Sequence, residues 1–440
     1  MDQLTDADGS FRVVARITSL DYSGQGDTTD DEEEEAIDNG YPDEDVSEDL
    51  NDPTPLRSYA QKLGKWIGVA AASYRYDCSS TEGPAAIVGA EFNLVVGENE
   101  MKFDATEPNR SEFNYGGADA VMALADRCDQ EVRGHTLAWH SQVPGWVSED
   151  GKKNNHNYSR EELLDILKNH IQNVAGNYKG RIREWDVVNE VLDDDQSIVR
   201  TQPDAYKLRP SIWNTYIGED FIDSAFVWAH QVDPTAKLYI NEYGAEMMGG
   251  AKSEAYFNLV KRLQKSGIPI DGCGLQCHFT TGEVDTLKLE KNIRRYAELG
   301  LNCIITELDI ALANPYAAEA LETQAKEYAA ITRVFLRNAN CPSMLIWGLA
   351  DHYSWRQNQP LLWDSQLQAK PAYYYVHAQL RKAASDATAI RSVPPSDSET
   401  IRIVCRNLAG QTVSPNSRGI LIEQGLKRDG SLITVKRINR

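Results

Sequence analysis

Residues 182–190, Ile-Arg-Glu-Trp-Asp-Val-Val-Asn-Glu, show the pattern that repeats through most of this 440-residue chain. Their β-branched and aromatic residues predict a strand over 182–189, which ends on two polar residues, Asn189 and Glu190. Seven similar runs predict further strands, at 66–71, 92–96, 132–139, 238–241, 274–278, 303–308 and 344–347. A single type of unit, a strand with a polar end, therefore accounts for the middle of the chain.

The segments between these strands predict helices. Ser159 and Glu162 have the spacing of a capping box before an amphipathic run that extends to about Tyr178. Further helices are expected over 211–230, 252–266, 287–299 and 318–338. Eight strands alternating with helices over residues 53–385 predict an α/β protein with a parallel (β/α)₈ barrel. An open doubly wound sheet would alternate in the same way, but no Gly-rich turn follows any early strand.

Both ends of the chain differ from this pattern. Residues 1–20 include an alternating run that predicts a strand left over from an upstream β-domain, and residues 21–52 form an acidic linker. Residues 386–440 predict a linker and a small β-module, with a hairpin turn at Asp429-Gly430. This module loosely resembles the C-terminal sorting signals of secreted proteins. Its strands are expected at 401–405, 419–422 and 432–435.

Composition excludes several classes of partner. The chain holds 45 basic and 66 acidic residues, a net charge of −21, which argues against binding nucleic acid. No segment reaches the roughly 20 apolar residues of a membrane helix, so no membrane partner is expected. The first residues lack the features of a signal peptide, so for a secreted or cell-surface protein that signal would lie outside this sequence. Seven cysteines, an odd number, indicate free thiols. Separately, we expect the protein to be a monomer.

The predicted strands end in residues suited to acid–base chemistry on a sugar. In a (β/α)₈ barrel the carboxyl ends of the strands form the active-site face. There Glu190 and Glu307 would face each other, as the two carboxyl groups of a glycosidase do. Asn189, beside one of them, could hydrogen-bond a sugar 2-hydroxyl. Flat apolar faces for sugar rings come from Trp139, Trp347 and Trp355.

The histidines at these strand ends do not indicate a metal. No His-Glu-x-x-His spacing occurs, and no two cysteine pairs have the spacing of zinc ligands. We therefore expect neither a metal nor another cofactor.

Five motifs resemble, in order along the chain, those of glycoside hydrolase family 10. They are ENEMK (98–102), RGHTLAWH (133–140), WDVVNE (185–190), ITELD (305–309) and LLWD (361–364) followed by KPAY (370–373). That family comprises retaining endo-β-1,4-xylanases with a (β/α)₈ fold. The resemblance covers residues from about 63 to 380 and implies xylan and xylo-oligosaccharides as substrates.

The resemblance also implies a role for each matching residue. Glu190 would be the general acid/base and Glu307 the nucleophile. His278 would hydrogen-bond Glu307 and be oriented by Asp309. Asn189 would contact the 2-hydroxyl, and Gln276 would lie near the acid/base. The implied substrate-binding residues are Glu98, Asn99, Lys102, His135, Trp139, Gln142, Tyr243, Trp347 and Trp355.

Two positions depart from the family pattern, and two other functions stay open. Phe103 stands where the family often has Trp, and Gly244 follows Tyr243 where the family usually has Asn. One alternative is another retaining barrel glycosidase, such as a β-glucanase or a mannanase. The other is a barrel that binds carbohydrate without cleaving it. The presence of both Glu190 and Glu307 disfavours that last reading.

Overall fold

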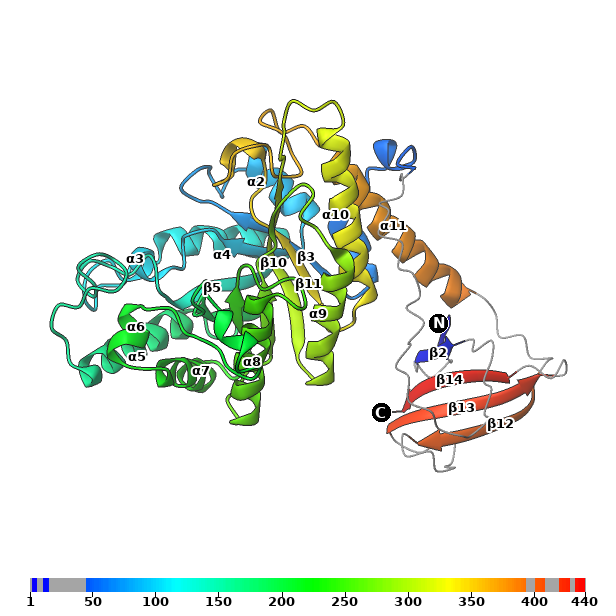
Figure 1. Cartoon of the computed structure of the whole chain (residues 1–440). Helices are drawn as coiled ribbons and strands as arrows, with labels where there is room; N and C mark the ends of the chain where they lie inside the picture. Colours follow the sequence, from blue (N-terminus) through cyan, green and yellow to red (C-terminus); the bar gives the residue numbers. More distant parts are fainter. Residues whose placement is uncertain are drawn as a thin grey trace. The chain divides into compact units, whose positions relative to one another are not determined.

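The computed structural model describes residues 2–5, 11–15, 45–392, 400–407, 419–427 and 432–439 (Figure 1). The chain divides into two compact units. One runs from Ile37 to Leu380, and the other combines Met1–Ala36 with Arg381–Arg440. The acidic linker predicted at 21–52 lies largely outside the described residues.

The larger unit is a closed barrel of eight parallel strands, as predicted. Each barrel strand pairs with the next barrel strand, so that β8 pairs with β10. The last strand, β11, pairs with both β10 and β3, which closes the ring. The short strand β9 (His278–Thr280) extends the edge of β10 beyond the end of β8. The barrel strands are β3 (Trp66–Ala71), β4 (Leu94–Gly97), β5 (Glu131–Trp139), β6 (Glu184–Asn189), β7 (Lys237–Glu242), β8 (Gly272–Leu275), β10 (Asn302–Ala311) and β11 (Ser343–Ile346).

Helices follow the strands around this ring (Figure 1). The predicted capping box is present, because Ser159 Oγ accepts the N–H of Glu162 and the Glu162 carboxylate accepts the N–H of Ser159. The single helix predicted over 211–230 is instead two helices, because Gly218 between them adopts a φ of 103°. The α-helices are α1 (Leu56–Lys62), α2 (Gly83–Glu91), α3 (Phe103–Thr106), α4 (Gly116–Cys128), α5 (Arg160–Asn177), α6 (Ile212–Tyr216), α7 (Asp220–Val232), α8 (Ala251–Lys265), α9 (Thr286–Glu298), α10 (Ala320–Arg337) and α11 (Pro371–Ser392). None of the described helices is long and apolar enough to cross a membrane.

Charged side chains of β5 and β6 form a buried cluster in the barrel unit. Arg133 on β5 donates to Glu184 (2.9 Å) and, through two nitrogens, to Asp186, both on β6. His135 Nδ1 lies 3.0 Å from Asp186 Oδ2. All four side chains are buried, so the charges of Arg133, Glu184 and Asp186 depend on their partners for stabilisation.

The residues just before Pro53 pack with the barrel. Asp49, on a short 3₁₀ helix (Asp49–Asn51), is buried, and its Oδ1 lies 2.6 Å from Nδ1 of His377 on α11. His377 Nε2 lies 2.9 Å from the carbonyl oxygen of Thr54. The last part of the predicted linker therefore contributes to the barrel unit.

The smaller unit contains an antiparallel five-stranded sheet in the order β1-β2-β14-β13-β12. The strand predicted to come from an upstream domain is β2, which pairs with β14, where Val14 is opposite Val435. The hairpin turn predicted at Asp429-Gly430 lies outside the described residues. The strands are β1 (Asp2–Thr5), β2 (Phe11–Ala15), β12 (Thr400–Asn407), β13 (Gly419–Lys427) and β14 (Leu432–Asn439).

Candidate active site

Glu307 lies on an irregular stretch of β10. Ile305 pairs with Met344 and Leu308 with Ile346, so three steps along β10 match two steps along β11. A bulge of this kind changes the direction of the side chains within it. Glu307 is 4% exposed and lines the cleft at the carboxyl ends of the strands.

His278, the first residue of β9, bridges Glu307 and Asp309. Its Nε2 lies 3.3 Å from Glu307 Oε2 and its Nδ1 lies 2.9 Å from Asp309 Oδ2. Burial by itself would lower the pKa of His278, but the two carboxylates, Asp309 above all, raise it to about 10. The ring is therefore an imidazolium that donates a hydrogen bond from each nitrogen. Asp309 is held in turn by Trp355 Nε1 (3.0 Å) and Arg356 Nη1 (2.6 Å).

These neighbours keep Glu307 ionised. Burial favours the protonated form, but the hydrogen bond from His278 and the electrostatic interactions with His135, His278 and Lys102 outweigh it and lower the pKa of Glu307. Asn241 Nδ2 also donates to Glu307 Oε1 (2.7 Å). Hydrogen bonds to both of its oxygens therefore hold the Glu307 carboxylate in one orientation.

Glu190 follows β6 directly and has a different environment. Its φ of 53° is left-handed, a conformation that non-glycine residues retain only where the surroundings hold it. Its N–H donates to the carbonyl oxygen of Asn241 (2.9 Å). Glu190 Oε1 accepts from Gln276 Nε2 (3.0 Å) and Asn189 Nδ2 (3.3 Å). The side chain is 13% exposed, so it is more open to the cleft than Glu307.

No role is predicted from the sequence for His140 or Asn241, although both are polar residues at strand ends. Asn241 Nδ2 donates to Asn189 Oδ1 (2.9 Å) as well as to Glu307, so it links the two strands that carry the carboxyl groups. His140 Nδ1 lies 3.7 Å from Glu190 Oε2. Burial, and then the nearby cations, lower the pKa of His140 to about 4, so this ring is neutral beside Glu190.

One end of the cleft is formed by the loops after β4 and β5. Lys102 Nζ donates to Asn99 Oδ1 (2.9 Å) and lies 4.8 Å from the ring centroid of Trp139. Glu98 lies in the same wall, where Arg75 Nε approaches it to 3.8 Å. This end therefore presents several hydrogen-bonding groups beside one flat aromatic face.

Tyr243, after β7, forms the opposite end. Its hydroxyl donates to Asp194 Oδ1 (2.5 Å) and accepts from Arg209 Nη2 (2.6 Å). Lys252 Nζ lies 3.4 Å from the ring centroid. These contacts fix the ring, while Gly244 beside it adds no side chain to the cleft.

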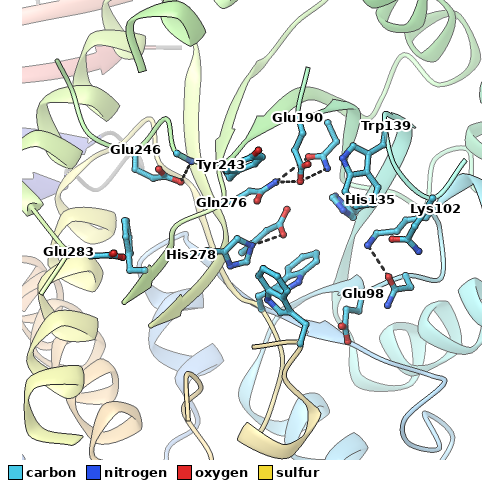
Figure 2. A pocket seen from close by; sticks show the side chains of 18 of the residues that line it. Glu98, Lys102, His135, Trp139, Glu190, Tyr243, Glu246, Gln276, His278 and Glu283 are labelled. Atoms are coloured by element: carbon cyan, nitrogen blue, oxygen red, sulfur yellow. Dashed lines mark hydrogen bonds and ion pairs between the residues drawn. The ribbon is translucent and has the colours of Figure 1, made fainter. Parts of the chain in front are cut away.

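The cleft has a volume of about 900 Å³ and gathers the predicted residues in one place (Figure 2). Asp309, which lies behind His278, is the one predicted residue that does not line it. In the part of the chain that the structure describes, no three His, Cys, Asp or Glu side chains are grouped to hold a metal ion. The predicted residues that line the cleft are Glu98, Asn99, Lys102, His135, Trp139, Gln142, Asn189, Glu190, Tyr243, Gln276, His278, Glu307, Trp347 and Trp355.

The barrel unit of this chain is similar to known proteins. The profile of Glycosyl hydrolase family 10 matches residues 55–379. The chain belongs to this family. One similar protein is endo-1,4-beta-xylanase B of Thermotoga neapolitana. It is 35% identical over 331 residues, which cover 73% of this chain and 90% of that protein. Exoglucanase XynX of Acetivibrio thermocellus is 37% identical over 340 residues, 75% of this chain and 30% of that protein. The crystal structure of xylanase 10B from Thermotoga petrophila in complex with xylobiose has a TM-score of 0.69 and 34% identity, covering 76% of this chain and 99% of that one.

Proposed function

We propose that this cleft hydrolyses β-1,4-xylosidic bonds within xylan by double displacement, with Glu307 as nucleophile and Glu190 as general acid/base. The observation that carries the proposal is the contrast between the two carboxyl groups. Glu307 is buried against an imidazolium, whereas Glu190 is more exposed and contacts two side-chain amides. A retaining glycosidase needs one group that is ionised and one that exchanges a proton.

The roles follow from these environments. In the first step Glu190 protonates the glycosidic oxygen while Glu307 attacks the anomeric carbon, so the leaving sugar departs and a glycosyl-enzyme forms. In the second step the Glu190 carboxylate takes a proton from water, the water oxygen bonds to the anomeric carbon, and Glu307 is released. Asn189 Oδ1 already accepts from Asn241, and one N–H of Asn189 Nδ2 donates to Glu190, which leaves the second N–H of Nδ2 to donate toward the 2-hydroxyl of the reacting sugar.

Xylan as the substrate is supported by the family and by its relatives. Several similar proteins are named endo-1,4-beta-xylanases, and one similar structure holds xylobiose. Glu98, Asn99, Lys102 and Gln142 line the cleft, and we expect them to leave no room for the hydroxymethyl group that glucose carries and xylose lacks. One relative is named an exoglucanase, so a glucan-cleaving enzyme is the alternative that substrate assays must compare.

Azide rescue tests both roles in one experiment. Glu190→Ala should still form the glycosyl-enzyme from dinitrophenyl xylobioside, whose leaving group needs no protonation, and azide should then give the β-azide. Glu307→Ala should give the α-azide by direct displacement. On xylan, Glu190→Ala should be slower by about 10²–10⁴-fold. Glu131→Ala, an exposed position at the opposite end of β5, is the control and should match the parent. Exchanged azide products would reverse the two roles.

Location outside the cell, a monomeric state and a sorting role for the C-terminal strands stay predictions. One similar structure is of an intracellular xylanase from Thermoanaerobacterium saccharolyticum, so membership of the family does not decide the compartment. Cell fractionation and sedimentation of the full chain would test location and oligomeric state.

A further inference from the structure

Three consecutive residues carry contacts to both proposed catalytic carboxyl groups. Gln276 Nε2 donates to Glu190 and His278 Nε2 donates to Glu307. Cys277 between them is fully buried and has a φ of 62°. This left-handed conformation is unfavourable for a residue with a side chain, so contacts with the surroundings must hold it.

The side chain of Glu246 supplies such a contact. Glu246 Oε1 accepts the backbone N–H of Cys277 (3.0 Å) and that of Gly244 (3.2 Å). The residue is 5% exposed, and its own backbone is anchored, because Asn292 Nδ2 donates to the carbonyl oxygens of Ala245 and Glu246, each at 2.8 Å. Figure 2 shows the Glu246 carboxyl beside Tyr243, away from Glu190 and His278. One buried oxygen thus joins the loop after β7 to the turn between β8 and β9.

We propose that Glu246 is a positioning residue, which fixes the left-handed turn at Cys277 so that Gln276 faces the acid/base and His278 faces the nucleophile. The inference rests on the proposed function, since it concerns the same two carboxyl groups. The same oxygen holds Gly244 and hence the loop that carries Tyr243. A single side chain therefore helps to position Gln276, His278 and the loop that carries Tyr243.

The two hydrogen bonds allow a sharp test, because both end on the same oxygen. Glu246→Gln keeps an oxygen at this position and removes the ability to ionise. Glu246→Leu has a similar size and removes both acceptors. A role for the charge or the proton of Glu246 predicts that both variants fail, whereas a positioning role predicts that only Glu246→Leu does.

Rates on xylan and on aryl xylobiosides should be measured per active site, titrated with a 2-fluoro xylobioside that traps the glycosyl-enzyme. Glu246→Gln should stay within about threefold of the parent. Glu246→Leu should lose about 10²-fold in kcat, the cost of a misplacement near 1 Å, with a smaller change in KM. The loss should be larger for substrates with poor leaving groups. The acid limb of the kcat/KM profile should move to higher pH, because the hydrogen bond from His278 to Glu307 is weakened.

Glu327→Leu is the matched control. Glu327 on α10 is also buried and accepts a loop N–H, that of Gly282 (2.7 Å), but it does not line the cleft. The Glu327→Leu substitution should lower thermal stability and leave both limbs of the pH profile of kcat/KM at the pH values of the parent. Adding Cys277→Gly to Glu246→Leu should restore at least fivefold in kcat, because glycine adopts this φ without strain.

An equal loss in Glu246→Gln and Glu246→Leu, or normal kinetics in Glu246→Leu, would overturn the proposal. If Glu246→Leu does not fold, Glu246→Gln still decides, since a loss of 30-fold or more in that variant contradicts a role through hydrogen bonds alone. The proposed function fails separately, through inactivity of the parent on xylan or through exchanged azide products.

Discussion

Replacing His278 by Gln should raise the pKa of Glu307 and move the acid limb of the pH–rate profile upward. In the parent the imidazolium Nε2 lies 3.3 Å from Glu307 Oε2. Two unit charges at that distance attract by about 5 kcal/mol at an effective dielectric constant near 20, which sets the upper limit. Gln keeps a neutral donor, so the loss is closer to the difference between a charged and a neutral hydrogen bond, about 1–2 kcal/mol. Lys102 and His135 remain to stabilise the anion.

That free energy corresponds to a rise of about one pKa unit. Since the pKa of Glu307 is lowered in the parent, its nucleophilic form persists to lower pH there, and His278→Gln loses this form first on the acid side. The assay is kcat/KM for dinitrophenyl xylobioside across the pH range, because its acid limb reports the free enzyme's nucleophile and the substrate needs no acid. When kcat/KM of each enzyme is divided by its own plateau value, the variant should be about tenfold lower than the parent at pH values below both acid limbs.

His377→Gln is the control for folding. His377 is buried and has both ring nitrogens close to oxygen atoms, like His278, but it lies away from the cleft, against Asp49 and Thr54. The acid limb of the kcat/KM profile of His377→Gln should coincide with that of the parent. An acid limb of folded His278→Gln that stays within about 0.3 units of the parent, or moves downward, would refute the electrostatic reasoning.

Three other outcomes are expected. Beechwood xylan or arabinoxylan should be hydrolysed at least tenfold faster than carboxymethylcellulose, a gap of about 1.4 kcal/mol in activation free energy, and equal rates would overturn the substrate assignment. A chain of residues 45–392, which retains Asp49 and all of α11, should keep its rate on short xylo-oligosaccharides within a few-fold; a hundredfold loss in a folded sample would show that an end of the chain reaches the active site. Arg133→Met should lower the free energy of unfolding by about 3–5 kcal/mol, because it removes the buried guanidinium that pairs with both Glu184 and Asp186. Arg181→Met breaks an exposed pair with Asp126 and should cost less than about 1 kcal/mol in the same denaturant titration, so similar losses in both variants would contradict this account.

The order of the elements and the residues at the strand ends could be predicted from the sequence. Strand patterns depend on residues a few positions apart, so the strand at 66–71 was predicted with the bounds that the structure has. Parallel strands in a closed barrel bring their carboxyl ends to one face, which is why Glu190 and Glu307 share a cleft although 117 positions separate them in the chain. The break at Gly218 was missed because the run around it keeps the composition of a helix.

The tertiary structure alone decided which partners those residues have. The imidazolium state of His278 depends on two carboxylates from β10, and the turn at Cys277 depends on Glu246 from the loop after β7. The partner of the N-terminal strand β2 is a strand near the other end of the chain. Local sequence determines the conformational preference of a segment and the chemistry that it offers. Charge states, strained turns and strand partners follow from burial and from groups that are distant in the chain, and these are set only when the chain has folded.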